Sequence, residues 1–102
     1  MTLTELILAV KEKNLSKDNL EAYRDQMSYL YAEMQLELAE VEKLKALFFV
    51  NHKENNQQES DIQIKRLWQF TEKGLREITL KRYCLATKEL LNSLKSRLYS
   101  IY

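Results

Sequence analysis

Five basic residues in the C-terminal half recur at a spacing suited to binding phosphates. Arg66, Lys73, Lys81, Lys88 and Lys95 follow one another at intervals of 7, 8, 7 and 7 residues. On an α-helix these intervals keep the five side chains within an arc of roughly 80°. Such a row neutralises successive phosphates and releases their counterions without reading the base sequence. The spacing therefore predicts a basic ridge, made of these five residues, that contacts nucleic acid.

Aromatic residues accompany the basic ridge and could stack on bases. The candidates are Tyr83, Tyr99 and Tyr102, or Trp68 and Phe70. An alternative interpretation needs no ligand, because residues 17–50 hold 4 Lys/Arg against 7 Asp/Glu. An acidic helix of that kind could pair with the basic ridge across the flank of a hairpin and set its register. The two interpretations are compatible.

Other residue types give weaker indications of chemistry. The single histidine, His52, has no partner at metal-ligand spacing, and Cys84 lies on an apolar stripe where a buried side chain is expected. Glu37 and Glu40 share a helical face and could hold Mg²⁺ for phosphate chemistry. A second acidic pair would be needed, whereas residues 61–102 offer only separated acids. We expect no cofactor, no metal and no enzymatic activity, with an acidic-cluster nucleotide hydrolase as a remote alternative.

The composition predicts an all-α fold. The chain has 102 residues with one glycine and no proline, so it lacks the residues that most turns and strand ends require. This length corresponds to one small domain, which we place at residues 1–102. Self-association would help so small a domain to bury its apolar surface.

Periodicity and capping signals divide the chain into helices. Thr2 with Glu5 predicts a short helix at about 2–14, and Ser16 predicts the start of a long helix at about 17–50. The segment 51–60 contains no apolar residue and is expected to be a polar connection. Ser60 with Gln63 then predicts a long helix at about 61–101. The expected fold is an elongated antiparallel helical hairpin with a short N-terminal helix.

The apolar faces of the two long helices indicate their neighbours. The first helix carries a heptad series, which is Leu20, Met27, Met34, Val41 and Phe48. The last helix carries two stripes, one from Ile64 to Ile78 and one from Leu80 to Ile101, rotated by on the order of 120° near Gly74. Two apolar directions predict assembly into a helical oligomer. Alternatively, the last helix breaks near Gly74 and the chain forms a compact monomeric bundle.

Apolar residues outside these stripes predict a surface that binds another protein. Tyr29 and Leu36 lie off the heptad series, and the segment "LFFV" is apolar on almost every side of its helix. The expected partner-binding residues are Tyr29, Leu36, Leu47, Phe48 and Phe49.

Charge and cysteine content suggest the environment. The net charge is +1, but residues 1–50 have a balance of −3 and residues 51–102 a balance of +4. The apolar start "LILAV" is too short for a membrane span, and one cysteine cannot form an intramolecular disulfide. We expect a protein of the cytoplasm, or of the host cytoplasm if a phage encodes it, that does not enter the membrane.

The C-terminal segment "LLNSLKSRLYSIY", residues 90–102, resembles the C-terminal helix of phage recombination mediators of the UvsY type. In both, an aliphatic helix continues into a Lys-Ser-Arg step, here Lys95, Ser96 and Arg97. The resemblance implies a ring-forming helical protein that binds single-stranded DNA, and it adds Arg97 to the candidate nucleic-acid-binding residues. This chain departs from that family in being short and in having a total charge close to neutral.

Two expectations of function follow. In the first, a self-associating helical protein contacts nucleic acid, with a role in recombination or DNA processing. In the second, the chain is an interaction module or inhibitor that docks on a larger protein through its exposed apolar residues. The partners expected are a second copy of the chain, single-stranded nucleic acid and a larger protein.

Overall fold

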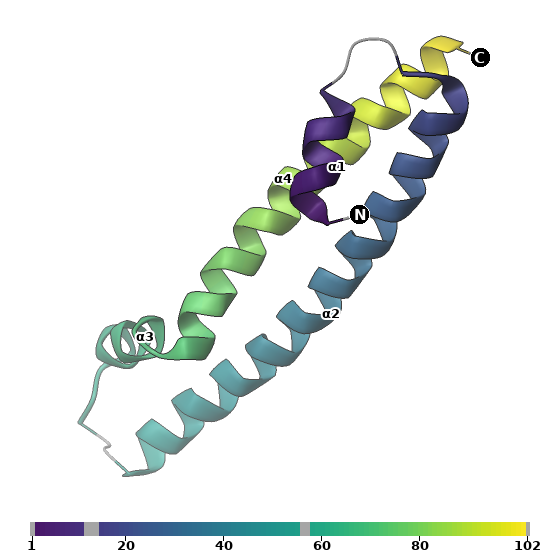
Figure 1. The fold of residues 1–102 in the computed structure, drawn as a ribbon. Helices are drawn as coiled ribbons and strands as arrows, with labels where there is room; N and C mark the ends of the chain where they lie inside the picture. Colours follow the sequence, from purple (N-terminus) through teal and green to yellow (C-terminus); the bar gives the residue numbers. More distant parts are fainter. Residues whose placement is uncertain (1, 12–14, 56–57, 102) are drawn as a thin grey trace. The chain divides into compact units, whose positions relative to one another are not determined.

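A computed structural model describes residues 2–11, 15–55 and 58–101. At Ile101 it describes the backbone but not the side chain. The described residues form four α-helices and no strands, as Figure 1 shows. They are α1 (Leu3–Val10), α2 (Lys17–Asn55), α3 (Asp61–Gln69) and α4 (Glu72–Ile101). The prediction of an all-α helical hairpin is confirmed, with α2 and α4 as its two arms.

Side-chain caps fix where three of the helices begin. The hydroxyl of Thr2 accepts a hydrogen bond from the Glu5 N–H at 3.2 Å, and that of Ser16 accepts one from the Asn19 N–H at 3.2 Å. Ser60 and Gln63 form the complete reciprocal capping box at the start of α3. Each cap satisfies N–H groups that the first helical turn cannot pair internally. The three predicted caps are therefore confirmed.

Three predicted helix ends need correction. The first helix ends at Val10 rather than near Asn14, which lies outside the described residues. The second continues to Asn55 rather than 50, because a polar sequence without Gly or Pro can extend an exposed helix. The predicted last helix is two helices, α3 and α4, separated at Phe70 and Thr71. The break falls before Gly74 and inside the first predicted stripe, whose members Leu75 and Ile78 lie exposed on α4.

The chain divides into two compact units that share α2 and α4. The first unit comprises residues 1–34 and 83–102, and the second comprises residues 35–82. In the first unit, α1 lies beside the C-terminal part of α4 (Figure 1). Its core consists of buried residues from all three helices, namely Leu6, Val10, Leu20, Met27, Leu91, Leu94 and Leu98. Burying one such side chain contributes about 1.5–3 kcal/mol, so this cluster fixes α1 on the hairpin.

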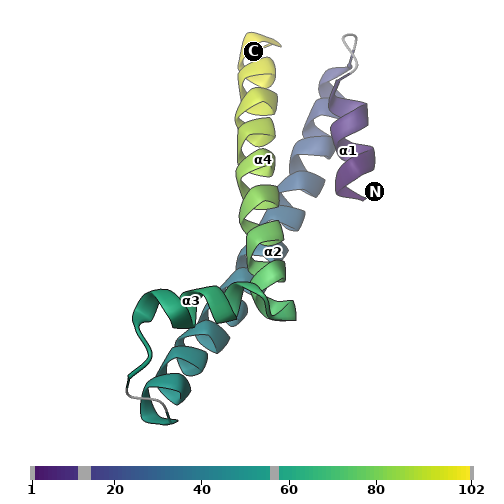
Figure 2. The same cartoon turned by 90° about the vertical axis from the view of Figure 1, so that its left-hand side faces the viewer.

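The second unit is organised around α3. Figure 2 shows α3 running in a different direction from the helix that follows it. Its inward face buries Ile64 and Trp68, and the Trp68 ring lies 5.5 Å from that of Phe48 on α2. Val41 of α2 and Leu80 of α4 are also buried. This unit therefore has a small core completed by aromatic packing.

Candidate nucleic-acid interface

The break between α3 and α4 divides the predicted basic ridge. Arg66 lies exposed on α3, whereas Lys73, Lys81, Lys88 and Lys95 lie exposed on α4. The prediction that five side chains share one arc required a single continuous helix. Because Arg66 lies on a separate helix, it does not belong to the basic ridge of α4. The four lysines keep their spacing along a single helix. We call Lys73, Lys81, Lys88 and Lys95 the α4 lysines.

In the second unit, acidic neighbours partly neutralise two of the α4 lysines. The ammonium of Lys81 lies 3.8 Å from Oε2 of Glu77, one helical turn before it. Lys73 is close enough to Glu37 to help lower the pKa of that carboxyl. These two lysines therefore have part of their charge balanced within the chain.

In the first unit, Lys88 and Lys95 are exposed and have no ion pair with any described residue. Lys95 borders an open hollow of about 530 Å³ together with Arg24, Ser28 and Tyr99. Arg24 pairs with its neighbour Asp25 at 3.2 Å. The hollow thus presents two cations, a hydroxyl and an aromatic ring, groups that bind a phosphate and stack on a base.

Tyr99 is the most exposed tyrosine of the described surface, at 81 %. Tyr83 is about half exposed, and Tyr102 lies outside the described residues. Of the other aromatic candidates, Phe70 is exposed and Trp68 is buried. Trp68 is therefore a core residue, and its ring cannot stack on an external base.

Arg97, the residue added by the resemblance, has a structural contact. Its Nη1 donates a hydrogen bond of 2.6 Å to the backbone carbonyl of Val10, at the end of α1. Carbonyls of the last helical turn lack internal partners, and a guanidinium there satisfies one and complements the helix dipole. Arg97 is half-buried and holds α1 against α4, so its availability to a phosphate is reduced.

Ion pairs between the arms of the hairpin use residues other than the α4 lysines. Within the second unit, Arg76 of α4 donates from both Nε and Nη2 to the carboxylate of Glu37 on α2, with Nη2···Oε1 at 2.8 Å. This hydrogen bonding is the main reason that the pKa of Glu37 lies below its ordinary value of 4.5, against the opposing effect of burial. Pairing between the helices therefore exists, and its α4 residues are Arg76 and Glu77, which pair with Glu37 and Lys45 of α2.

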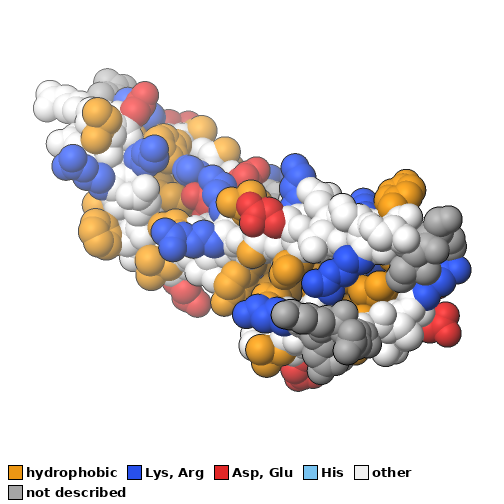
Figure 3. Space-filling view, turned by 90° about the horizontal axis from the view of Figure 1, so that it is seen from above, with side chains coloured by type: hydrophobic (Ala, Val, Ile, Leu, Met, Phe, Trp, Pro, Cys, Tyr) orange, Lys and Arg blue, Asp and Glu red, His pale blue; other side chains and the backbone are white. Residues whose placement is uncertain are grey.

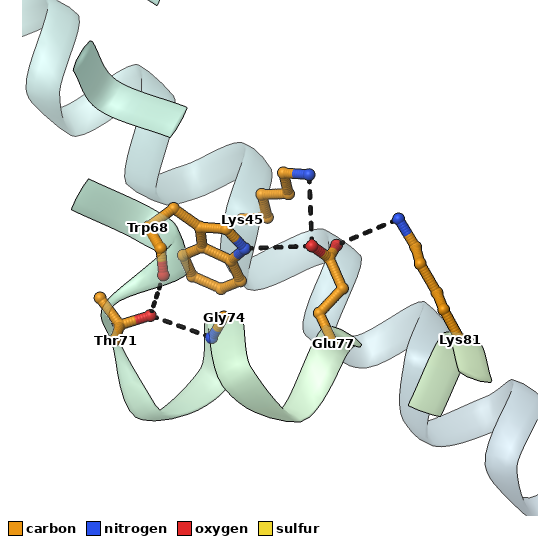
Figure 4. Close-up of polar contacts among 6 residues, drawn as sticks. All are labelled: Lys45, Trp68, Thr71, Gly74, Glu77 and Lys81. Atoms are coloured by element: carbon orange, nitrogen blue, oxygen red, sulfur yellow. Dashed lines mark hydrogen bonds and ion pairs between the residues drawn. The ribbon is translucent and has the colours of Figure 1, made fainter. Parts of the chain in front are cut away.

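A buried carboxylate organises the second unit. Figure 4 shows Glu77 of α4 accepting hydrogen bonds at 3.3 Å from Trp68 Nε1 on α3 and from Lys45 Nζ on α2. Thr71 connects the two helix ends beside it, since its hydroxyl donates to the Trp68 carbonyl at 2.6 Å and accepts from the Gly74 N–H at 3.0 Å. Periodicity did not identify this network, because a lone Glu on an apolar face gives no sequence signal.

The predicted partner-binding residues fall into two groups. Tyr29, Leu36 and Leu47 are exposed, as that prediction requires. Phe48 and Phe49 are half-buried, and Phe48 packs against Trp68 and against His52, whose ring centroid lies 4.4 Å away. Figure 3 shows hydrophobic side chains reaching the surface between Lys and Arg side chains on the face that it presents.

The residues considered for metal or nucleophilic chemistry have structural surroundings. His52 Nδ1 lies 2.8 Å from a carboxylate oxygen of Glu59, so this contact joins the last turns of α2 to the residues before α3. Cys84 is buried as predicted, and desolvation raises the pKa of its thiol, which disfavours the nucleophilic thiolate. Among the described residues, no three His, Cys, Asp or Glu side chains are arranged to hold a metal ion.

No protein-family model, curated protein or solved structure matches this chain. Within the described ranges, every helix is too short or too polar to cross a bilayer. The exposed cations of α4 and the exposed apolar side chains are the features of the described surface that bear on function.

Proposed function

We propose that this chain is a non-enzymatic, self-associating helical protein that contacts nucleic acid through α4. The contact is centred on Lys88 and Lys95, with the hollow bordered by Arg24 and Tyr99 beside them. The observation that carries the proposal is the difference between paired and unpaired cations. Arg76 forms an ion pair with Glu37 of α2, whereas Lys88 and Lys95 are exposed and form no ion pair with a described residue.

The chemistry of the contact is electrostatic. A phosphate that meets these ammonium groups releases condensed counterions, and a base beside it can stack on the exposed ring of Tyr99. Neither interaction selects a base sequence. A role as an accessory in recombination or DNA processing is consistent with the Lys-Ser-Arg resemblance at residues 95–97.

The test is a fluorescence-anisotropy titration with a labelled single-stranded oligonucleotide, repeated at several salt concentrations and with the matching duplex. Wild-type protein should bind at low salt, with an affinity that falls steeply as salt rises. Replacing Lys88 and Lys95 together by Gln should weaken binding at least about tenfold at low salt. The slope of the logarithm of the binding constant against the logarithm of the salt concentration should also become less steep by about 1.4. This is the value expected for two lost contacts to single-stranded phosphates.

The control variant removes the same number of positive charges at positions outside the proposed site. Lys11 and Lys65 are exposed and unpaired with described residues, and neither belongs to the α4 lysines. Their joint replacement by Gln should leave the affinity within about twofold of wild type. Equal losses in the two double variants would show attraction to total charge alone, and no binding by wild type at low salt would refute the proposal.

A second candidate function is docking on a larger protein. It is favoured by Phe70 at the end of α3, which is 85 % exposed beside a hollow formed by Gln63, Arg66 and Leu67. Protruding aromatic side chains next to Arg are typical anchors of protein interfaces. If Phe70→Ala abolished capture of a partner that Lys88→Gln retained, the docking function would be preferred.

A further inference from the structure

The outward face of α2 in the second unit carries a heptad pattern that no described residue covers. Leu36, Lys43 and Val50 follow one another at intervals of seven, and Ala39 and Ala46 stand three residues after Leu36 and Lys43. All five are exposed, with Leu36 at 71 % and Val50 at 51 %. In heptad terms, each a position holds a side chain larger than alanine, and each d position holds alanine. We call these five residues the outer seam.

The outer seam is distinct from the face that α2 gives to its own core. Val41 is buried and Phe48 half-buried on the inward face, and at about 100° per residue Lys43 lies roughly 160° around the helix from Val41. Helix α2 therefore has two faces with coiled-coil spacing, and the hairpin uses one. The sequence repeats the outer pattern one heptad earlier, at Tyr29 and Ala32, which are also exposed.

We propose that the outer seam pairs antiparallel with the outer seam of a second copy of this chain. In an antiparallel pair, each a residue of one helix packs in a layer with a d residue of the other. Leu36 then lies over Ala46 of the second copy, and Lys43 over Ala39. Every layer combines a long side chain with a methyl group, so the seam is its own steric complement and the two backbones can approach closely.

The pattern of side-chain size and charge disfavours the parallel alternative. A parallel pair stacks a on a and d on d. Lys43 would then face Lys43, which places two ammonium groups in the seam, while the alanine layers would leave unfilled space. The antiparallel order removes both defects, because it separates the two lysines and fills the space above each alanine.

The flanks of the seam supply the complementary charge. Glu40 and Glu42 stand on either side of the seam near Lys43, and all three are exposed. Within one chain the Lys43 ammonium lies 3.3 Å from Oε1 of Glu40. In the pair, the stem of Lys43 crosses Ala39 of the second copy and its ammonium reaches the carboxylates at that seam's edge. A single Lys at an a position costs stability but specifies register, so association should be reversible.

The association is tested by sedimentation velocity over a range of concentrations. Wild-type protein should form dimers, and replacing Ala39 and Ala46 together by Glu should raise the dimer dissociation constant at least about tenfold. The larger side chains would hold the two backbones apart, and each Glu at position 46 would place a carboxylate against Leu36 of the second copy. The matched control is Ala86→Glu with Ser93→Glu, a pair of exposed α4 positions at the same interval of seven. Lys43→Leu should tighten association about tenfold, since it removes the polar residue from the seam.

The orientation is tested by disulfide formation in a Cys84→Ala background. Chains carrying Ala39→Cys, mixed with chains carrying Lys43→Cys, should form the mixed disulfide faster than either variant cross-links with itself. That order follows because only the mixed pair shares an antiparallel layer. Faster self-linkage of Ala39→Cys would indicate a parallel pair and overturn the proposal.

The proposed pairing rests on the self-association in the proposed function, but the outcomes separate the two. Dimers that survive the Glu pair at 39 and 46 would leave self-association standing and refute the outer seam. A wild-type chain that stays monomeric at all concentrations would refute both. Oligonucleotide binding by the variant that lacks Lys88 and Lys95 tests the α4 lysines, none of which belongs to the outer seam.

Discussion

At the scale of single residues, Glu77 contacts side chains from three helices of the second unit. Its buried carboxylate accepts hydrogen bonds from α3 and α2, through Trp68 and Lys45, while Lys81 lies near its second oxygen. A buried donor left without its acceptor loses both the hydrogen bond and its hydration. Glu77 therefore links three helices of one unit through a single side chain.

Replacing Glu77 by Ala should lower the free energy of unfolding by about 2 kcal/mol, because Trp68 Nε1 and Lys45 Nζ both lose their acceptor. Glu77→Gln should cost less, since one oxygen remains to accept. Urea titration followed by fluorescence of Trp68, the single tryptophan, measures both losses. Glu89→Ala, an exposed position on the same helix, should change the value by no more than about 0.5 kcal/mol. A Glu77→Ala variant as stable as this control would contradict the role assigned to the carboxylate.

Glu37 gives a prediction of pH dependence. Its pKa is lower in the folded chain than the ordinary 4.5, chiefly because Arg76 donates hydrogen bonds to it. A depressed carboxyl pKa contributes stability above the unfolded pKa and loses it as the pH falls through the folded pKa. The pair is partly exposed, so Glu37→Gln should cost less than about 1 kcal/mol at pH 7, and the difference from wild type should shrink as the pH falls below 4.5. Urea titrations of both proteins at pH 7 and at a series of pH values below 4.5 test this, and a difference that stays constant with pH would contradict it.

At the scale of elements, the junction of α3 and α4 depends on Gly74 for space rather than for backbone conformation. No described glycine has a positive φ. A Cβ built on Gly74 would lie 1.9 Å from the Trp68 carbonyl oxygen, so the last turn of α3 closes directly over this residue. Thr71 joins the same two helix ends through its hydroxyl. The sharp junction therefore requires a residue without a side chain at position 74.

Replacing Gly74 by Ala should destabilise the chain by about 1–3 kcal/mol, because the Trp68 carbonyl must move. Helix propensity alone predicts the opposite sign, a gain of about 1 kcal/mol. Chemical denaturation of wild type and Gly74→Ala gives the sign of the change in the free energy of unfolding. The variant Ala86→Gly, at an exposed helical position, measures how much the difference in helix propensity between Ala and Gly contributes in the same chain. A stabilising Gly74→Ala substitution would contradict the inference that the Trp68 carbonyl leaves no room for a side chain at position 74.

The sequence predicts a helix start where a local capping signal is present, and it misses a start where that signal is absent. Thr2, Ser16 and Ser60 are hydroxyl residues before an apolar series, and the first and third have Glu or Gln three residues on, so their helices begin where expected. Thr71 caps α4 in the same way, but the residue three positions later is Gly74. The capping signature is absent there because the close packing excludes a side chain. The change in the phase of the apolar stripe indicated a possible break near Gly74, but it did not place the break at Phe70 and Thr71.

The candidate site was less predictable than the helices, because burial and pairing depend on contacts between distant residues. Periodicity places the α4 lysines on one side of a helix, yet it cannot distinguish Lys95, which is exposed, from Arg97, whose guanidinium binds the Val10 carbonyl 87 residues away. Likewise, Tyr29 and Leu36 could be identified as lying off the core series. The complementarity of the outer seam emerged only when the intervening alanines proved to be exposed.

At the scale of the whole molecule, two units with small cores share the helices α2 and α4. A chain of this size buries a limited fraction of its surface, so neither unit has much stability of its own. Because α2 and α4 run through both units without interruption, unfolding of either removes helical neighbours from the other. We therefore expect one cooperative unfolding transition.

Thr87 allows this cooperativity to be tested from the first unit. Its side chain is fully buried on α4, and its hydroxyl has no hydrogen-bond partner among the described residues. Thr87→Val keeps the shape and removes the unpaired hydroxyl, so it should raise the free energy of unfolding by about 1 kcal/mol. Trp68 fluorescence reports on the second unit and far-ultraviolet circular dichroism on all helices. In a cooperative chain both midpoints rise together, whereas an unchanged Trp68 midpoint with a shifted dichroism curve would show that the two units unfold independently.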